Sequence, residues 1–166
     1  MGYGLPAAIG ACITNGKPVI CLEGDGSIMM NLQELQTVKT NHLPLKIFIL
    51  KNGEYHSIFQ TQNNFFKGRL TGCNTTSGVE VPDFVRVAKA FGLPALRITK
   101  NKELPSKIKR VLQHKGPLVC EVDCLSDYIF APKLSARKLS NGILQSPTLE
   151  DMFPFLDRET YKKAKF

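Results

Sequence analysis

The chain has 166 residues, of which 43% are hydrophobic and 22% charged, a balance typical of a globular domain and not of a disordered chain. No apolar run approaches the roughly 18–20 residues that a membrane-spanning helix needs. The net charge of +8 is concentrated in residues 100–115, where six basic residues face one acidic residue, and no nucleic-acid-binding motif accompanies them.

Short apolar runs alternate with helical patterns along the first 126 residues. Four runs predict β-strands at residues 19–22, 45–50, 95–98 and 118–122, and their continuous or nearly continuous apolar character is typical of strands covered on both faces. Helices are predicted behind Pro6, over residues 28–38, from Val81 to Gly92, and over residues 103–114. The alternation predicts a parallel sheet in a layered α/β domain.

The basic segment has two interpretations. Its apolar residues recur at helical spacing, so its lysines fill the outer face of an amphipathic helix; these apolar residues are Leu104, Ile108, Val111 and Leu112. A nucleic-acid-binding patch is the alternative, but no arginine–aromatic interleaving supports it. We therefore favour a solvated helix face.

Two stretches lack this alternation. Residues 52–80 are predicted to be a long functional loop, and residues 127–166 an extended C-terminal arm with one helical turn at 149–153. We therefore divide the chain into a domain of residues 1–126 and an arm of residues 127–166. Four phenylalanines of these stretches are expected to be exposed and to favour self-association, namely Phe65, Phe66, Phe153 and Phe155.

Five cysteines are an odd number, and none forms a CxxC pair. This pattern argues against a disulfide-stapled secreted fold and against a structural zinc site. We therefore expect a cytoplasmic protein. Cys12, Cys21 and Cys120 lie in apolar runs, where buried free thiols are expected.

The segment Glu23–Ser27 connects a predicted buried strand to a helix. Its glycines allow a close approach of the main chain to a ligand, and the start of the helix favours an anion such as phosphate. Asp25 would repel a bare phosphate, since both are negatively charged. A Mg²⁺ ion bound between them would remove this repulsion. The alternative is a tight turn in which Asp25 caps the helix.

The next strand ends at Lys51, directly before Asn52. Two consecutive strand ends therefore offer a carboxylate and an amide oxygen to one point, and Mg²⁺ prefers such oxygen ligands. Taken alone, Asn52-Gly53 is better interpreted as a plain turn.

Gly-Asp-Gly-Ser at 24–27, followed by Asn52, resembles the binding signature of thiamine diphosphate enzymes. Segments 1–10, 31–35 and 130–133 are similar to segments of acetolactate synthases, and 57–69 to acetolactate synthase-like proteins. The resemblance covers nearly the whole chain. It implies a three-layer α/β/α thiamine diphosphate-binding fold with a mainly parallel sheet.

The resemblance implies roles for individual residues. Asp25 and the side chain of Asn52 would bind Mg²⁺, with the main-chain carbonyl of Glu54 as the third protein ligand. The diphosphate would be held by Gly24, Gly26 and Ser27.

Further residues would contact the rest of the cofactor. Met1 matches the large apolar residue that props thiamine in its bent conformation. Tyr55 and His56 would lie near the thiazolium and the diphosphate, where His56 is either an acid or base or a plain loop residue. Lys51 departs from the family, which more often has asparagine there.

Enzymes of this family also have a pyrimidine-binding domain, which a neighbouring subunit contributes together with the glutamate that activates the cofactor. No part of this chain resembles that domain, and the strand that normally precedes the Met1–Gly4 segment is absent. We therefore expect an N-terminally clipped diphosphate-binding domain, inactive alone, from a homo-oligomeric enzyme that decarboxylates 2-oxo acids and joins the product to a second carbonyl. The alternative is a non-catalytic nucleotide- or flavin-binding α/β module, which predicts a GxGxxG turn or a flavin-stacking loop instead.

Overall fold

The computed structural model describes residues 1–126 and 128–164, in two compact units that divide after Ser126. Residues 127, 165 and 166 of the predicted C-terminal arm lie outside the described residues. None of the described helices is both long and apolar enough to cross a bilayer.

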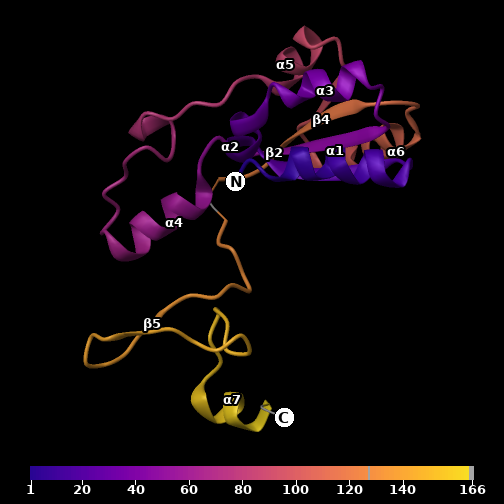
Figure 1. Cartoon of the computed structure of the whole chain (residues 1–166). Helices are drawn as coiled ribbons and strands as arrows, with labels where there is room; N and C mark the ends of the chain where they lie inside the picture. Colours follow the sequence, from indigo (N-terminus) through magenta and orange to yellow (C-terminus); the bar gives the residue numbers. More distant parts are fainter. Residues whose placement is uncertain (127, 165–166) are drawn as a thin grey trace. The chain divides into compact units, whose positions relative to one another are not determined.

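A four-stranded sheet forms the centre of the first unit (Figure 1). Its strands are β1 (Val19–Gly24), β2 (Leu45–Lys51), β3 (Ala95–Ile98) and β4 (Leu118–Asp123). They pair in the order β1-β2-β4-β3, and every pair is parallel. The four predicted strands are confirmed, and their carboxyl ends share one edge of the sheet.

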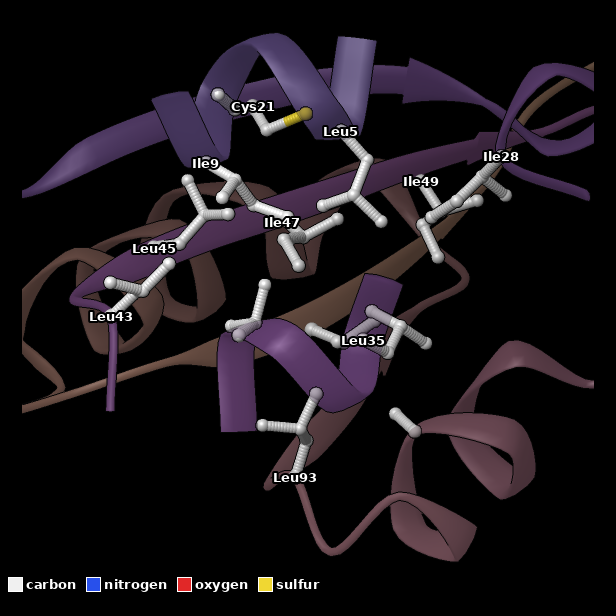
Figure 2. Close-up of a cluster of buried hydrophobic side chains, with 14 of the residues drawn as sticks. Leu5, Ile9, Cys21, Ile28, Leu35, Leu43, Leu45, Ile47, Ile49 and Leu93 are labelled. Atoms are coloured by element: carbon white, nitrogen blue, oxygen red, sulfur yellow. The ribbon is translucent and has the colours of Figure 1, made fainter. Parts of the chain in front are cut away.

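Helices cover both faces of this sheet. Helices α1 (Gly4–Asn15), α3 (Glu34–Thr40) and α5 (Phe84–Ala90) pack on one face around Leu45, Ile47 and Ile49 of β2 (Figure 2). Helix α6 (Leu104–Gln113), which follows the short helix η3 (Asn101–Glu103), packs on the other face against β3 and β4. The three-layer α/β/α architecture is thus confirmed, as is the amphipathic α6, although Leu112 is exposed.

The helix predicted over residues 28–38 begins earlier and is divided. It consists of α2 (Asp25–Ile28), η1 (Met29–Asn31) and α3, and the backbone between them stays in the right-handed helical region. The chain therefore turns directly from β1 into a helical path at Asp25, within the Gly-Asp-Gly-Ser segment.

The prediction that all strands are covered on both faces is wrong for β1. Its Cys21 side is buried against α1, but on the other side Ile20 is 56% and Leu22 is 68% exposed. The reason is that β1 lies at the edge of the described sheet, whereas α6 packs over β3 and β4.

The loop predicted over residues 52–80 contains two helices, α4 (His56–Phe65) and η2 (Thr75–Ser77), so that prediction is wrong. The buried residues of α4 are the polar His56 and Gln60, and a polar buried face leaves no apolar periodicity in the sequence. Phe65 and Phe66 are exposed, as expected.

The second unit contains a short antiparallel pair, β5 (Arg137–Lys138) and β6 (Leu144–Gln145), and helix α7 (Arg158–Ala164). In place of the helical turn expected at 149–153, the Asp151 N–H donates to the Thr148 carbonyl in an isolated turn. Phe153 and Phe155 are half-buried and make an edge-to-face contact, which corrects their expected exposure.

The cysteines are free thiols, and Cys12, Cys21 and Cys120 are buried as predicted. Burial raises the pKa of the Cys21 and Cys120 thiols to about 11, so both stay protonated at neutral pH. They act as small apolar side chains in the core.

Candidate functional site

The ends of β1 and β2 bring the two predicted site segments together. Gly24 lies opposite Leu50 in the parallel register, so Asp25 and the turn after Lys51 emerge side by side. The Gly53 N–H donates to Oδ2 of Asp25 at 2.7 Å, and the Gly26 N–H donates to Oδ1 at 2.7 Å. The carboxylate of Asp25 thus joins both segments directly.

Asp25 is only 2% exposed. Burial raises the pKa of its carboxyl group, whereas the backbone hydrogen bonds and the charge of Lys51 act in the opposite direction. An ionised carboxylate has about four lone-pair sites. The backbone N–H groups of Gly26, Gly53 and Asn52 hydrogen-bond to this carboxylate, so about one acceptor site is left for a cation.

The turn after β2 is shaped by its own side chains. Oδ1 of Asn52 accepts a hydrogen bond from the Glu54 N–H at 3.1 Å, and Glu54 forms an isolated antiparallel bridge with Asn74. The Glu54 carboxylate bonds to His56. The Glu54 carboxylate is thus engaged, and the resemblance assigns the ligand role to the main-chain carbonyl of Glu54 instead.

Among the described residues, no group of three or more His, Cys, Asp or Glu side chains is gathered as a metal centre. The predicted ligand set is of another kind, with one carboxylate, one amide oxygen and one main-chain carbonyl. Oxygen ligands of this type suit Mg²⁺, which usually completes its shell with phosphate oxygens and water.

His56 is the first residue of α4 and is 5% exposed, so its interpretation as a loop residue is wrong. Its Nδ1 bonds to Oε1 of Glu54, its Nε2 lies 3.0 Å from Nε2 of Gln60, and its ring stacks on Phe59. Gln60 was missed by the sequence analysis, because its i+4 spacing from His56 has meaning only once a helix is known there.

The two glycines of the Gly-Asp-Gly-Ser segment have different surroundings. A Cβ atom at Gly24 would meet no atom of the described residues within 4 Å, whereas one at Gly26 would lie 2.4 Å from Cε1 of Tyr55. Tyr55 is fixed by its N–H, which donates to the Cys73 carbonyl at 2.7 Å. Gly26 therefore allows Tyr55 to pack on the turn, and Gly24 leaves open space for a ligand.

Replacing Gly26 by alanine should lower the thermal midpoint of unfolding, because the new methyl group overlaps the Tyr55 ring. Gly24→Ala is the matched control, since its backbone is in the extended region and no atom lies in the way. We expect Gly24→Ala to unfold at or slightly above the wild-type temperature. Equal midpoints for the two variants, measured by circular dichroism, would contradict this account of the turn.

The N-terminal segment lies against the start of α2. The Gly2 N–H donates to Oγ of Ser27 at 2.9 Å, and the Met1 side chain is 67% exposed. A hydroxyl group can accept one hydrogen bond while it donates another. Ser27 therefore keeps a donor for a ligand while it holds Gly2.

Glu23 is buried, and its Oε2 has no hydrogen-bond partner among the residues that the structure describes. A Cβ atom at Gly4 would lie 1.8 Å from this oxygen, so Gly4 makes room for the carboxylate beneath the first turn of α1. A carboxylate is stabilised at the N-terminus of a helix by the unpaired N–H groups there.

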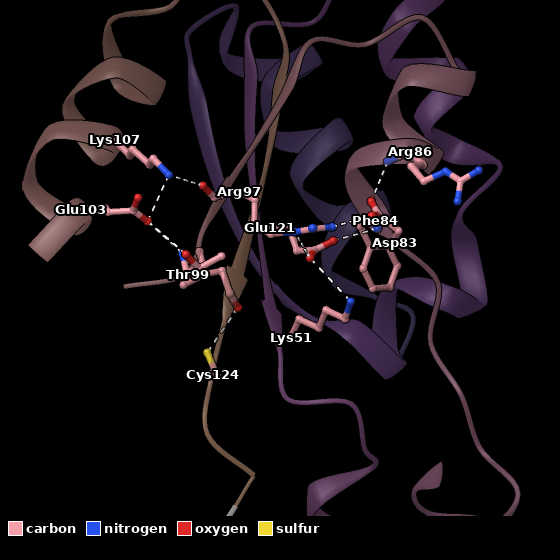
Figure 3. A network of polar contacts seen from close by, with 11 residues as sticks. Lys51, Asp83, Phe84, Arg86, Arg97, Thr99, Glu103, Lys107, Glu121 and Cys124 are labelled. Carbon is pink, nitrogen blue, oxygen red and sulfur yellow. Dashed lines mark hydrogen bonds and ion pairs between the residues drawn. The ribbon is translucent and has the colours of Figure 1, made fainter. Parts of the chain in front are cut away.

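Lys51 is the residue at which the sequence departs from the family pattern. Its side chain extends toward the buried Glu121 of β4. Its Nζ lies 3.6 Å from Oε1 of Glu121, which also accepts from Nε of Arg97 at 2.6 Å (Figure 3). Oε2 of Glu121 accepts from the Phe84 N–H at 2.8 Å, and Arg97 pairs with Asp83 at 2.7 Å. This network fixes the carboxyl ends of β2 and β4 beside the candidate site.

Comparison with known sequences gives one family match. The profile of the family described as "Thiamine pyrophosphate enzyme, C-terminal TPP binding domain" matches residues 1–122. The match includes every site residue considered above.

Curated relatives are similar over the same region. The acetolactate synthase large subunit of Cyanidium caldarium is 44% identical over 126 residues, which are 75% of this chain and 21% of that protein. Acetolactate synthase 2, chloroplastic, of Zea mays is 39% identical over 127 residues, 74% of this chain and 20% of that protein. The acetolactate synthase isozyme 2 large subunit of Escherichia coli (strain K12) is 41% identical over 123 residues, 74% of this chain and 22% of that protein. The chain thus spans about a fifth of the length of these relatives.

Proposed function

This chain belongs to the family of the C-terminal TPP-binding domain of thiamine pyrophosphate enzymes, and from that premise we propose that its strand-end segments bind thiamine diphosphate through Mg²⁺. The observation that carries the proposal is the buried carboxylate of Asp25, which accepts backbone hydrogen bonds from both segments. A divalent cation would balance its charge and bridge it to the diphosphate.

The residues present fit this cofactor. Asp25, the Asn52 side chain and the Glu54 carbonyl would supply oxygen ligands to Mg²⁺. Gly24 leaves the main chain open beside them, as a closely approaching diphosphate requires. The other groups proposed to contact the cofactor are Gly26 and Ser27 at the diphosphate and Met1, Tyr55 and His56 along its length.

In the enzyme that contains this domain, we propose an activity of the acetolactate synthase type, as the names of the relatives suggest. The cofactor, when bound, supplies an electron sink for the decarboxylation of a 2-oxo acid and the transfer of the remaining carbons to a second carbonyl. The chain's own residues bind and orient that cofactor, and Glu54, His56 and Gln60 keep the turn after β2 rigid.

The proposal includes a partner. Thiamine would extend from this domain to a pyrimidine-binding domain of a neighbouring subunit, in a cytoplasmic homo-oligomer. Exposed apolar side chains support such contacts, including Ile20 and Leu22 of β1 and Phe65 and Phe66 at the end of α4.

Calorimetric titration with thiamine diphosphate tests the proposed function. The wild-type chain is expected to bind it only when Mg²⁺ is present, and to bind neither NAD nor FMN. Asp25→Ala should weaken binding by more than about 100-fold, because indirect partners of metal ligands already account for about 10- to 100-fold. Asp123→Ala, which removes an exposed carboxylate at the end of β4, is the matched control and should bind as the wild type does. Binding that Asp25→Ala leaves unchanged would refute the role of this residue, and preferential binding of FMN or NAD would favour a nucleotide-binding module.

A further inference from the structure

Both polar groups of the Gly2 backbone are held by side chains of the helical segment after β1. The Gly2 N–H donates to Oγ of Ser27 at 2.9 Å, and the Gly2 carbonyl accepts a hydrogen bond from Nδ2 of Asn31 in η1. Gly2 lies outside α1, so no helical hydrogen bond fixes it. These two bonds determine where the segment before α1 lies.

The fit between Gly2 and η1 is close. Gly2 has φ +75°, a conformation that favours glycine. A Cβ atom at Gly2 would lie 2.9 Å from Nδ2 of Asn31 and 3.0 Å from Cβ of Met30. Any other residue would therefore push the segment away from Asn31.

The amide of Asn31 is itself oriented. Nε2 of the exposed Gln33 donates to Oδ1 of Asn31 at 3.2 Å. Because the oxygen of the amide accepts this bond, the NH₂ group is the one that faces the Gly2 carbonyl. Two successive hydrogen bonds thus connect the exposed Gln33, through Asn31, to the N-terminal segment.

Met1 precedes Gly2, whose carbonyl accepts the hydrogen bond from Asn31. Met1 is 67% exposed, and its peptide bond to Gly2 links its position to the contact between Gly2 and Asn31. We propose that Asn31 is a positioning residue that, through the Gly2 carbonyl, holds Met1 where it supports the thiamine part of the cofactor. This inference rests on the proposed function, in which Met1 contacts thiamine and the Gly24–Ser27 segment contacts the diphosphate.

The test compares two ligands on the full 166-residue chain, thiamine diphosphate with Mg²⁺ and inorganic pyrophosphate with Mg²⁺. Asn31→Ala should weaken thiamine diphosphate about 3- to 10-fold, the equivalent of one hydrogen bond, and change pyrophosphate less than about 2-fold. Hydrogen exchange in residues 1–5 should become faster. Intact mass is measured to ensure that every preparation retains Met1.

Asn41→Ala is the matched control. Nδ2 of Asn41 also donates to a backbone carbonyl, that of Thr37, at 2.9 Å, but this contact lies at the exposed end of α3. It should change the affinity for neither ligand. If Asn31→Ala does not fold, Gln33→Ala removes only the orientation of the Asn31 amide and should shift affinities in the same direction by a smaller factor.

Unchanged thiamine diphosphate affinity in Asn31→Ala, or an equal loss for both ligands, would overturn this inference and leave the proposed function standing. A wild-type chain that binds neither ligand would overturn the proposed function itself. Weakening confined to thiamine diphosphate supports both.

Discussion

Replacing Arg97 by alanine is expected to lower the free energy of unfolding by about 3 kcal/mol, because it leaves a buried carboxylate without its closest cationic partner. Glu121 is fully buried, and Nε of Arg97 lies 2.6 Å from its Oε1. Lys51, at 3.6 Å, and the Phe84 N–H remain in the variant. Because these partners remain, we expect a loss of stability at the lower end of the roughly 3–5 kcal/mol that breaking a buried ion pair costs.

The loss in the free energy of unfolding of Arg97→Ala should also depend on pH. Arg97 hydrogen-bonds to Asp83 and holds the pKa of that carboxyl group below its ordinary value of 3.8. A carboxyl group with a lowered pKa in the folded state adds stability above the unfolded value, and this stability is lost as pH falls through the folded value. The difference between wild type and Arg97→Ala should therefore be largest near neutral pH and shrink below about pH 4.

Urea denaturation at pH 7 and at pH 3.5 measures both effects. Arg86→Ala is the matched control on α5, since the Arg86 side chain is exposed, and it should stay within about 0.5 kcal/mol of the wild type. An Arg97→Ala variant as stable as Arg86→Ala would show that the network in Figure 3 does not stabilise the sheet edge.

The 166-residue chain alone is expected to form no acetolactate from pyruvate, even with saturating thiamine diphosphate and Mg²⁺. An acidic residue must assist the pyrimidine end of the cofactor, and the family resemblance assigns it to a different domain. The chain's own candidates are engaged or remote: the Glu54 carboxylate bonds to His56, and Glu34 accepts from Oγ1 of Thr37 at 2.8 Å. Glu23 is buried beneath the start of α1.

A colorimetric acetolactate assay checks this expectation, with cofactor alone as the blank. Product above the blank that is lost in Asp25→Ala would contradict it. The variant Glu23→Gln would then show whether the buried carboxylate beneath Gly4 supplies the missing acid.

Much of the fold was predictable because its signals are local. The runs that became β1 to β4 are apolar or nearly so over four to six residues, and the parallel arrangement follows from the helices between them. The same reasoning predicted that Asp25 and the turn at Asn52 meet, because the carboxyl ends of parallel strands share an edge. The Gly53–Asp25 hydrogen bond confirms that the two segments touch.

What was missed depends on contacts between distant or polar residues. Helix α4 buries His56 and Gln60 and exposes Ile58, the reverse of the apolar pattern that sequence analysis detects. The approach of Lys51 to Glu121 joins residues on two strands far apart in sequence, and no local spacing indicates it. The exposure of Ile20 and Leu22 likewise depends on which strand lies at the edge of the described sheet.

The most direct test of the central claim is a crystal structure of the chain with thiamine diphosphate and Mn²⁺, an anomalous scatterer that accepts the same oxygen ligands as Mg²⁺. The account predicts one metal peak about 2.1–2.3 Å from a carboxylate oxygen of Asp25, the amide oxygen of Asn52 and the main-chain carbonyl of Glu54, with diphosphate oxygens in the remaining positions. A metal bound elsewhere, or side chains of Asp25 and Asn52 more than about 10 Å apart in ordered segments, too far to share one octahedral ion, would contradict it.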